Sequence, residues 1–508
     1  MTMVMSVDPR SGGAIGPVAP PTAADEVRAR CEAASAAGEE LASIGRAGRA
    51  RLLRAMAEAL RERSGALVSL ADRETALGEA RLTGELTRTA FQLDFFAEVV
   101  EDGAYLEATI DHPGPTPMGA RPDLRRMLVP LGPVAVFGAS NFPFAFSVPG
   151  GDTASALAAG CAVVAKAHDA HPATSVACAE ALAAGAVAAG VEAPLVQLVF
   201  GERAGVDLVR DEAIRAVGFT GSLHGGRALA RVAQERPSPI PFYGELGALN
   251  AFVVCPEAAA ARGAEVGRGL AASFTLGVGQ FCTKPGIAFV PRGAGGDELV
   301  RALTDAVGEA APQVMLSERI ADAYRAGSAS RSALEGVTTL AGERSGAGSG
   351  CWAAPLVLAC EIGDLDGALL EECFGPIVIA CSYRDLDEVR AGLSRLTPGL
   401  TGTIHADDAD AQFASAVLGD LSPRVGRLVW NGYPTGVAVA WAMHHGGPFP
   451  AATDPLHSSV GASSIRRFLR PVSFQGLPEA LLPRELVDVP APEHRVPRRV
   501  DGVLDLPE

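Results

Sequence analysis

A cysteine and a glutamate in glycine-rich surroundings carry the most specific chemistry that this sequence offers. Cys282 follows Gly-Gln-Phe, and Glu245 stands within Tyr-Gly-Glu-Leu-Gly. A thiolate can attack an electrophilic carbon, and a poorly solvated carboxylate can activate the water that resolves the covalent intermediate. Glycines at 277, 279 and 286 predict room for a substrate to approach the thiol. The alternative interpretation is a buried structural cysteine, because free cysteine is among the most buried residue types.

The two lysines of the chain, Lys166 and Lys284, stand out because arginine supplies all other positive side chains. A position that keeps lysine needs a compact ammonium, which a planar guanidinium does not replace. Lys166 follows the apolar run 161–165 and is expected at the end of a buried strand, whereas Lys284 lies two residues after Cys282. Chance survival of lysine at these two positions is the alternative.

The composition describes a packed globular protein. A chain of 508 residues predicts two or three domains, and 48% hydrophobic with 20% charged residues excludes a disordered chain. The formal net charge of -16 argues against nucleic acid or an anionic membrane surface as a partner. The sequence also has no unbroken apolar run of about 18 residues, the length that a membrane span requires.

The cysteines and the N-terminus indicate a cytoplasmic protein. The nine cysteines form no C-x-x-C pair, and their odd number predicts reduced thiols. Residues 1–21 are rich in glycine, proline and small side chains and lack the apolar core of a signal peptide, so a loose N-terminal arm is expected.

The histidines predict no metal site. Pro172 breaks the local helix that would align His168 with His171. The pair His444-His445 has no cysteine or carboxylate close by in sequence before Asp454. A zinc site would need such a partner at short spacing.

Hydrophobic patterning predicts an α/β fold with two sheets. Apolar residues at helical spacing dominate residues 22–100. Short apolar runs then alternate with alanine-rich helical stretches, which is typical of a parallel sheet in a doubly wound, dinucleotide-binding domain. These runs are 134–137, 161–165, 196–200 and 214–219. A second α/β series follows, with strands expected at 251–254, 286–290, 377–380, 402–404 and 427–430.

Three further segments are expected outside the sheets. Residues 111–126 are rich in proline and glycine and then charged, as in an exposed crossing segment. Residues 345–350 form a Gly/Ser loop. The proline-rich region after 463 is expected to be an arm that packs on another surface.

Two strand ends carry residues that could bind a cofactor or a reacting oxygen. Gly221 and Ser222 lie where a strand passes into a helix, and the free N–H groups of a helix N-terminus bind phosphate. Asn141 follows the first strand in Asn-Phe-Pro, and its amide could stabilise an oxyanion together with the Cys282 N–H. A tight turn is the alternative interpretation of each segment.

A third motif, Glu-Glu-Cys-Phe-Gly-Pro at 371–376, places a carboxylate and an aromatic ring beside a rigid turn. Glu372 could accept hydrogen bonds from ribose hydroxyls, and Phe374 could pack near a flat ring. A solvated helix end is the alternative.

Taken in order, the Asn-Phe-Pro, Phe-Thr-Gly-Ser, Glu-Leu-Gly, Gly-Gln-x-Cys and Glu-x-Phe-Gly-Pro motifs resemble the aldehyde dehydrogenase superfamily. The resemblance covers roughly residues 22–475. The runs 166–172 and 442–450 are most similar to the bacterial NADP-type and 2-oxoglutarate-semialdehyde dehydrogenase branch. Ala248, where many members have a second glycine, is a small departure.

The resemblance implies roles for the residues already named. Cys282 is the nucleophile, Glu245 the general base and Asn141 part of the oxyanion hole. The cofactor NADP or NAD is then bound by the residues that match the family motifs. Lys166 would bind the adenosine ribose, Gly221 and Ser222 the pyrophosphate, and Glu372 with Phe374 the nicotinamide ribose and ring.

The family fold implies a cofactor-binding domain at 22–110 and 128–246 and a catalytic domain at 247–455. A small bridging or oligomerisation sheet and a C-terminal arm are implied at 111–127 and 456–508, with assembly as a homodimer or homotetramer. The implied reaction is oxidation of a small aldehyde to the acid through a cysteine thioester, with hydride transfer to NAD(P). The branch includes carboxylated semialdehydes, and no residue is assigned to bind that carboxylate.

Asp169 bears on the choice of cofactor. An acidic residue at this position accepts a hydrogen bond from the adenosine 2′-hydroxyl and repels a 2′-phosphate. It therefore favours NAD, while the branch resemblance favours NADP, and the preference stays open. Two other functions also stay open: a CoA-acylating semialdehyde dehydrogenase and a catalytically idle binding protein of the same fold.

Overall fold

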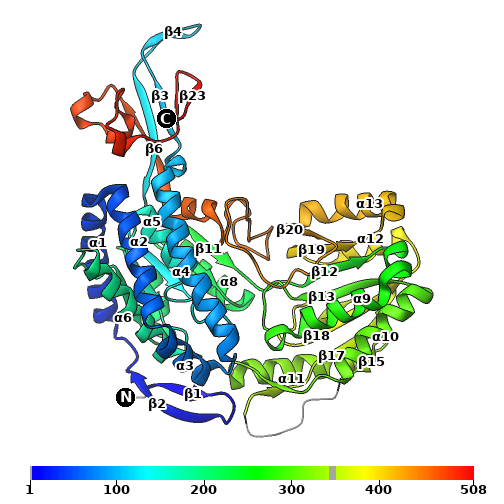
Figure 1. The fold of residues 1–508 in the computed structure, drawn as a ribbon. Helices are drawn as coiled ribbons and strands as arrows, with labels where there is room; N and C mark the ends of the chain where they lie inside the picture. Colours follow the sequence, from blue (N-terminus) through cyan, green and yellow to red (C-terminus); the bar gives the residue numbers. More distant parts are fainter. Residues whose placement is uncertain (1–2, 343–349, 508) are drawn as a thin grey trace.

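The computed structural model describes residues 3–342 and 350–507. Two α/β lobes lie side by side, and a narrow sheet extends away from one of them (Figure 1). The first two residues of the expected arm and most of the expected 345–350 loop lie outside the described residues. Within those residues, no helix is long and apolar enough to cross a membrane.

The first lobe contains a parallel sheet of five strands in the order β11-β10-β7-β8-β9. The strands are β7 (Val134–Phe137), β8 (Val163–Lys166), β9 (Val196–Val199), β10 (Ala216–Thr220) and β11 (Phe242–Glu245). Their side chains are mostly buried because helices cover both faces of the sheet (Figure 1). From β7 the chain adds β8 and β9 on one side of the sheet and then β10 and β11 on the other. The strand order therefore reverses between β7 and β10, and ligands usually bind at such a point in this type of fold.

The helices of this lobe come from two parts of the chain. The first four precede the sheet: α1 (Ala24–Ser43), α2 (Gly45–Glu62), α3 (Ser64–Thr75) and α4 (Glu79–Asp102). The others connect its strands: α5 (Gly151–Ala159), α6 (Pro172–Ala188), α7 (Glu202–Arg210) and α8 (Leu223–Gln234). Apolar side chains of both groups form one core with the strands.

The second lobe contains seven strands in the order β15-β17-β18-β13-β12-β19-β20. Six run parallel: β12 (Asn250–Val254), β13 (Pro285–Pro291), β17 (Leu356–Glu361), β18 (Ile377–Tyr383), β19 (Gly399–His405) and β20 (Val425–Trp430). The edge strand β15 (Thr338–Ala341) is antiparallel. The helices are α9 (Pro256–Thr275), α10 (Ala294–Gly308), α11 (Glu318–Ser332), α12 (Leu386–Arg395) and α13 (Ala411–Leu421). The predicted fold class, a doubly wound Rossmann-like domain with a second α/β domain, is confirmed.

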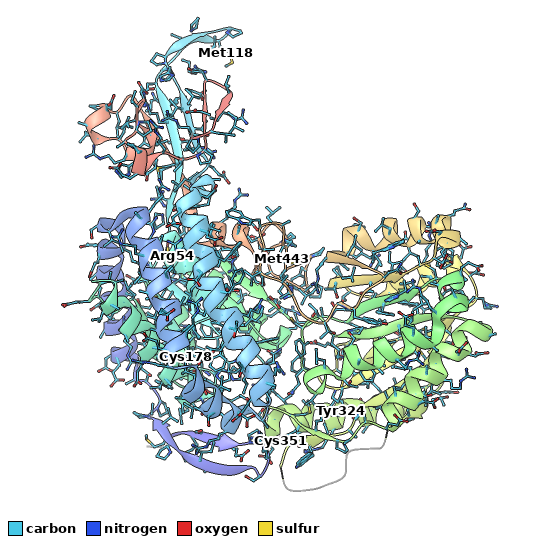
Figure 2. The ribbon with its side chains drawn as sticks, in the orientation of Figure 1. Arg54, Met118, Cys178, Tyr324, Cys351 and Met443 are labelled. Carbon is cyan, nitrogen blue, oxygen red and sulfur yellow. The ribbon has the colours of Figure 1, made fainter. Side chains whose placement is uncertain are left out.

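The narrow sheet pairs two strands from residues 108–130 with three strands from the C-terminal region. Its order is β21-β6-β3-β22-β23. The strands are β3 (Ala108–Asp111), β6 (Leu124–Pro130), β21 (Leu469–Gln475), β22 (Arg498–Val500) and β23 (Val503–Asp505). The hairpin of β4 (Gly114–Thr116) and β5 (Gly119–Arg121) extends beyond it, with Met118 98% exposed at the tip (Figure 2).

The prediction of a loose N-terminal arm is wrong over the described residues. β1 (Val4–Asp8) and β2 (Gly13–Ala19) form an antiparallel hairpin, and Gly12 takes the left-handed conformation in its turn. Arg10 Nη2 donates to Asp72 Oδ2 at 2.7 Å, which fixes the hairpin on α3. Glycine at this position therefore serves a tight turn, although glycine-rich composition alone suggested looseness.

Candidate active site

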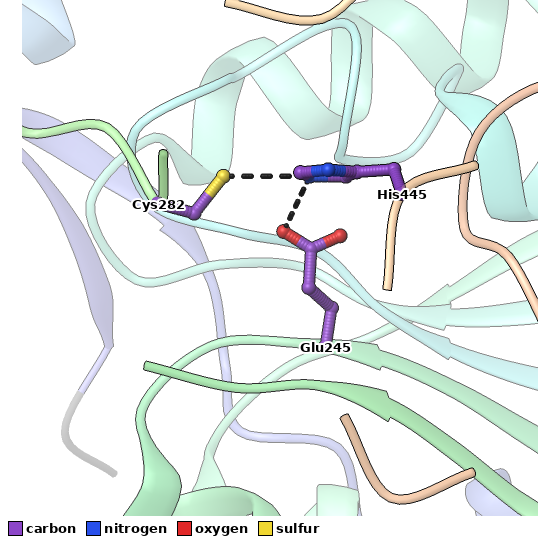
Figure 3. Close-up of side chains that lie close together, drawn as sticks. All are labelled: Glu245, Cys282 and His445. Atoms are coloured by element: carbon purple, nitrogen blue, oxygen red, sulfur yellow. Dashed lines mark hydrogen bonds and ion pairs between the residues drawn. The ribbon is translucent and has the colours of Figure 1, made fainter. Parts of the chain in front are cut away.

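The predicted nucleophile and base lie together where the two lobes meet. Glu245 is the last residue of β11, and Cys282 lies in the loop before β13. A third side chain, His445, joins them from the segment after β20 (Figure 3). His445 Nε2 lies 2.9 Å from Glu245 Oε1 and 3.5 Å from Cys282 Sγ. The topology thus brings a thiol, an imidazole and a carboxylate into one hydrogen-bonded cluster.

The segment after His445 holds this cluster in place. Ser459 Oγ donates to Glu245 Oε2 at 2.5 Å, so both carboxylate oxygens have a partner. Ser459 N also donates to the His445 carbonyl at 2.8 Å, and His445 N donates to Ser458 Oγ at 2.9 Å. Glu245 is 4% exposed and His445 is 1% exposed. These contacts fix the orientation of buried polar groups that would be costly to leave unpaired.

The pKa values of the two reactive groups are shifted in opposite directions. Burial raises the pKa of Glu245, but the charge and hydrogen bond of His445 and the hydrogen bonds of Ser459 and Cys282 outweigh it, so this pKa lies below its ordinary value. Burial and the Glu245 carboxylate both raise the pKa of the Cys282 thiol well above its ordinary value. The resting cluster therefore contains an ionised carboxylate and a protonated thiol, with a proton acceptor beside the thiol.

Asn141 lies at the same site. Its Nδ2 donates to the Gln280 carbonyl at 2.8 Å, two residues before Cys282 in the chain. Because a side-chain amide has two N–H groups, one remains for an oxyanion. Two residues of α4 hold the Asn141 turn: Arg81 Nη2 donates to the Asn141 carbonyl at 2.7 Å, and Glu85 Oε1 accepts from the N–H groups of Phe144 and Ala145.

The glycines around Cys282 serve close packing, and the expectation that they leave room for a substrate is wrong. A Cβ on Gly277 would lie 2.5 Å from Arg81 Nη1, and one on Gly279 would lie 2.2 Å from the Gly375 carbonyl oxygen. A Cβ on Gly286 would lie 2.4 Å from a methyl carbon of Leu249. The protein itself fills these spaces, so the glycines let the nucleophile loop lie against its neighbours.

Lys284 anchors the loop that carries Cys282 to the second sheet. Its Nζ donates to the Ile377 carbonyl on β18 at 2.8 Å, and burial lowers the pKa of the ammonium to about 8. Asn250 Nδ2 donates to the carbonyls of both Cys282 and Lys284. The compact ammonium expected from the scarcity of lysine thus reaches a backbone carbonyl in a space closed to solvent.

The residues expected to bind a cofactor lie at the carboxyl edge of the first sheet and beside the nucleophile. Ser222 caps α8, where its Oγ accepts from Gly225 N at 3.2 Å, and the N-terminus of this helix is open to solvent. Lys166 ends β8 and donates to Asp169 Oδ1 at 2.8 Å. Gly221 N donates to the Glu245 carbonyl at 3.1 Å, which places the turn expected to bind phosphate directly beside the expected base.

Glu372 and Phe374 belong to the second lobe, in the segment between β17 and β18. A Cβ on Gly247 would lie 2.1 Å from Glu372 Oε2, so the carboxylate packs against the backbone that follows the base. Burial raises the pKa of Glu372 to about 7, with the charge of Lys284 acting in the opposite direction. An open helix N-terminus, an ammonium and this carboxylate fit a dinucleotide that carries phosphates and ribose hydroxyls.

Comparisons with known proteins agree with this geometry. The aldehyde dehydrogenase family profile matches residues 2–448. Alpha-ketoglutaric semialdehyde dehydrogenase 2 of Azospirillum brasilense is 44% identical over 501 residues, which cover 97% of this chain and 95% of that protein. The chain belongs to the aldehyde dehydrogenase family.

Other relatives support the same family. Alpha-ketoglutaric semialdehyde dehydrogenase of Acinetobacter baylyi is 41% identical over 451 residues, which cover 86% of this chain and 84% of that protein. The resemblance to the 2-oxoglutarate-semialdehyde branch is thereby confirmed. As a family member, the chain is an enzyme that oxidises an aldehyde to the acid with a nicotinamide cofactor.

Solved structures share the fold. The structure of 3,6-anhydro-L-galactose dehydrogenase in complex with NAP has a TM-score of 0.79 and 21% identity, covering 93% of this chain and 96% of its own. Aldehyde dehydrogenase C of Pseudomonas syringae, in complex with NAD+ and octanal, has a TM-score of 0.79 and 19% identity, covering 95% of each chain.

His445 and Ser459 are the site residues that the aldehyde dehydrogenase motifs did not reveal. His445 has no cysteine or carboxylate close to it in sequence. The fold supplies both partners, Cys282 and Glu245, from more than 160 positions away. Sγ, Nε2 and the carboxylate oxygen lie within 4.8 Å of one another, a combination that zinc accepts. A zinc ion there would occupy the atoms that aldehyde oxidation uses, so it would compete with catalysis.

Replacing Ser459 with alanine tests how Glu245 is kept ionised. A donor to the ionised carboxylate lowers its pKa, so its loss raises that pKa and leaves less base at low pH. We expect the acidic limb of the kcat profile to move to higher pH, because the carboxylate loses one hydrogen bond that favours its ionised form. Turnover measured from acidic to neutral pH checks this, with Ser473→Ala, exposed on β21, as the control. An unmoved limb would show that Ser459 does not set this ionisation.

Proposed function

We propose that this aldehyde dehydrogenase oxidises a short aldehyde that carries a carboxylate at its other end, such as 2-oxoglutarate semialdehyde. The product is the dicarboxylic acid. The cluster of Cys282, His445 and Glu245 carries the reaction type, because it provides a nucleophile and a base in one buried site. The names of the two relatives that are more than 40% identical support the substrate class.

The reaction begins with transfer of the thiol proton to the His445–Glu245 pair. The Cys282 thiolate attacks the aldehyde carbon, and the free N–H of the Asn141 amide and the Cys282 backbone N–H hold the oxygen that becomes negative. When bound, the nicotinamide accepts the hydride that this carbon loses. Cys282 then holds the acyl group as a thioester.

Hydrolysis of the thioester falls to Glu245. Once the proton taken from the thiol has left to solvent, the Glu245 carboxylate takes a proton from a water molecule, which attacks the acyl carbon; the C–S bond breaks, and the sulfur leaves as the Cys282 thiol while the acid is released. The hydrogen bond from Ser459 keeps Glu245 oriented during this step. A buried carboxylate beside the thiol supports hydrolysis, so a CoA-acylating enzyme and a catalytically idle protein are not favoured.

The proposal also covers cofactor and assembly. Lys166 and the N-terminus of α8 hold the adenosine ribose and the pyrophosphate, while Glu372 and Phe374 lie at the nicotinamide end. The Lys166–Asp169 ion pair supports a preference for NAD, since the carboxylate would repel a 2′-phosphate. The extended third sheet supports assembly as a homodimer or homotetramer through the bridging segments 111–127 and 456–508.

The Glu245→Gln variant tests the division of labour between acylation and hydrolysis. It should still release a rapid burst of reduced cofactor, because acylation uses Cys282, His445 and the cofactor. Steady turnover should fall by about 10²–10⁴-fold as general-base catalysis is lost. Stopped-flow absorbance of the reduced nicotinamide measures both phases, and Cys282→Ala, which should give no burst, is the control. Unchanged steady turnover in Glu245→Gln would refute its role.

The Asp169→Ser variant tests the cofactor preference. Removing the carboxylate frees Lys166 for a 2′-phosphate, so the ratio of kcat/KM for NADP to that for NAD should rise by roughly tenfold or more, as for a changed charge contact at a binding site. Steady-state kinetics with both cofactors measures the ratio, and Asp25→Ser, exposed on α1, is the control. Equal ratios in wild type and variant would show that Asp169 does not select the cofactor.

A further inference from the structure

One face of α4 carries four polar side chains at helical spacing and turns them toward the active site. They are Arg81, Glu85, Arg88 and Gln92. Leucines at neighbouring positions of the helix are buried in the core, so polar residues on this inner face need a role. Arg81 and Glu85 have one, because they hold the turn that carries Asn141.

Arg88 differs from its neighbours on this face. Both its Nη1 and its Nη2 are buried, and neither has a hydrogen-bond partner among the described residues. Its guanidinium lies 5.1 Å from the centre of the Phe146 ring, a cation–π contact that leaves the N–H groups unused. A buried guanidinium without an anion is costly, so a protein that keeps one at an active site has a use for it.

A short chain of contacts links Arg88 to the reactive cluster. The Phe146 ring lies 6.1 Å from the His445 ring, and His445 Nε2 lies 3.5 Å from Cys282 Sγ. The positive charge of Arg88 interacts with Cys282 and Glu245 as well as with Glu85. None of these three groups forms an ion pair with Arg88 among the described residues, so its Nη1 and Nη2 keep their hydrogen-bonding capacity close to the reactive cluster.

Most of the other charged groups close to this region have hydrogen-bond partners. Glu245 is bound by His445 and Ser459, and Glu85 Oε1 accepts two backbone N–H groups, whereas Glu85 Oε2 is buried without a hydrogen-bond partner among the described residues. Arg81 lies over the rings of Phe142 and Phe281 and donates to the Asn141 carbonyl. Arg427 on β20 also acts on Cys282, but its Nη2 is bound to the Pro434 carbonyl. Arg88 alone of these cations has both terminal nitrogens buried and unpaired among the described residues.

We propose that Arg88 is the specificity residue of the aldehyde site and binds the distal carboxylate of the substrate through Nη1 and Nη2. A planar guanidinium with two parallel N–H groups matches a carboxylate in bidentate fashion. The aldehyde end then reaches Cys282 while Phe142, Phe146 and Phe281 pack around the carbon chain. This inference rests on the proposed function, because it names the residue that selects a carboxylated aldehyde.

The experiment compares glutarate semialdehyde with pentanal, which has a methyl group in place of the distal carboxylate. The ratio of their kcat/KM values in wild type should fall by about 10- to 100-fold in Arg88→Met, the range expected when a charged hydrogen-bond partner is removed. Arg88→Lys should retain part of the ratio, since it keeps the charge and loses the bidentate geometry. Arg51→Met, exposed on α2, is the control and should keep the wild-type ratio.

Thermal unfolding separates recognition from a structural role. Because Nη1 and Nη2 of Arg88 have no hydrogen-bond partner among the described residues, Arg88→Met should leave the melting temperature unchanged or raise it. Added glutarate, a product-like dicarboxylate, should raise the melting temperature of the wild type and of Arg51→Met but not that of Arg88→Met. This readout needs no turnover.

The outcomes distinguish the two proposals. If wild type oxidises neither aldehyde, the proposed function fails, and the glutarate shift still reports on Arg88. An equal loss on both aldehydes together with a lower melting temperature would make Arg88 structural and overturn the inference. A ratio that falls in Arg427→Met and stays unchanged in Arg88→Met would also overturn it, because the carboxylate receptor would then be Arg427.

Discussion

The active site is built around one buried carboxylate, that of Glu245. An ionised carboxylate without partners in an apolar interior would be so costly that it would take up a proton and lose its function as a base. His445 and Ser459 prevent this by bonding one oxygen each. Glu245 comes from the end of the first sheet and its two partners from the segment after β20, so the base is functional only when both lobes and this segment are assembled.

The same carboxylate makes the thiol harder to ionise. Burial and the charge of Glu245 both raise the pKa of Cys282, so stabilising the base weakens the resting nucleophile. The hydrogen-bonded cluster reduces this conflict. When the thiol proton moves to His445 or Glu245, the total charge of the cluster stays the same, and no net charge has to enter a buried space. His445 connects the two ends of this cluster through its Nε2.

The sequence predicted the layers of the fold well because each buried strand is a short apolar run. The run 134–137 coincides with β7, and the motifs placed Cys282 and Glu245 together. The partners of Glu245 were not predictable in this way. His445 and Ser459 are ordinary polar residues in a loop, and only the pairing of distant segments gives them a partner. Local composition also misled at the N-terminus, where glycine supports a hairpin turn, and near Cys282, where glycines allow close packing.

The inner face of α4 connects substrate recognition with the chemistry. Arg81 and Glu85 fix the turn that carries Asn141, and Arg88, one or two helical turns further along, lies over Phe146 from that same turn. A helix of 24 residues is a rigid support, so the distance between an anion at Arg88 and the amide of Asn141 is set by the backbone. The Glu85 charge and the Phe146 ring offset part of the cost of the unpaired guanidinium, and a ligand that brings its own carboxylate would offset the rest. An aldehyde without that group would leave Arg88 buried and unpaired. Its binding would therefore be weaker than that of a carboxylated aldehyde by the free energy of the Arg88–carboxylate contact.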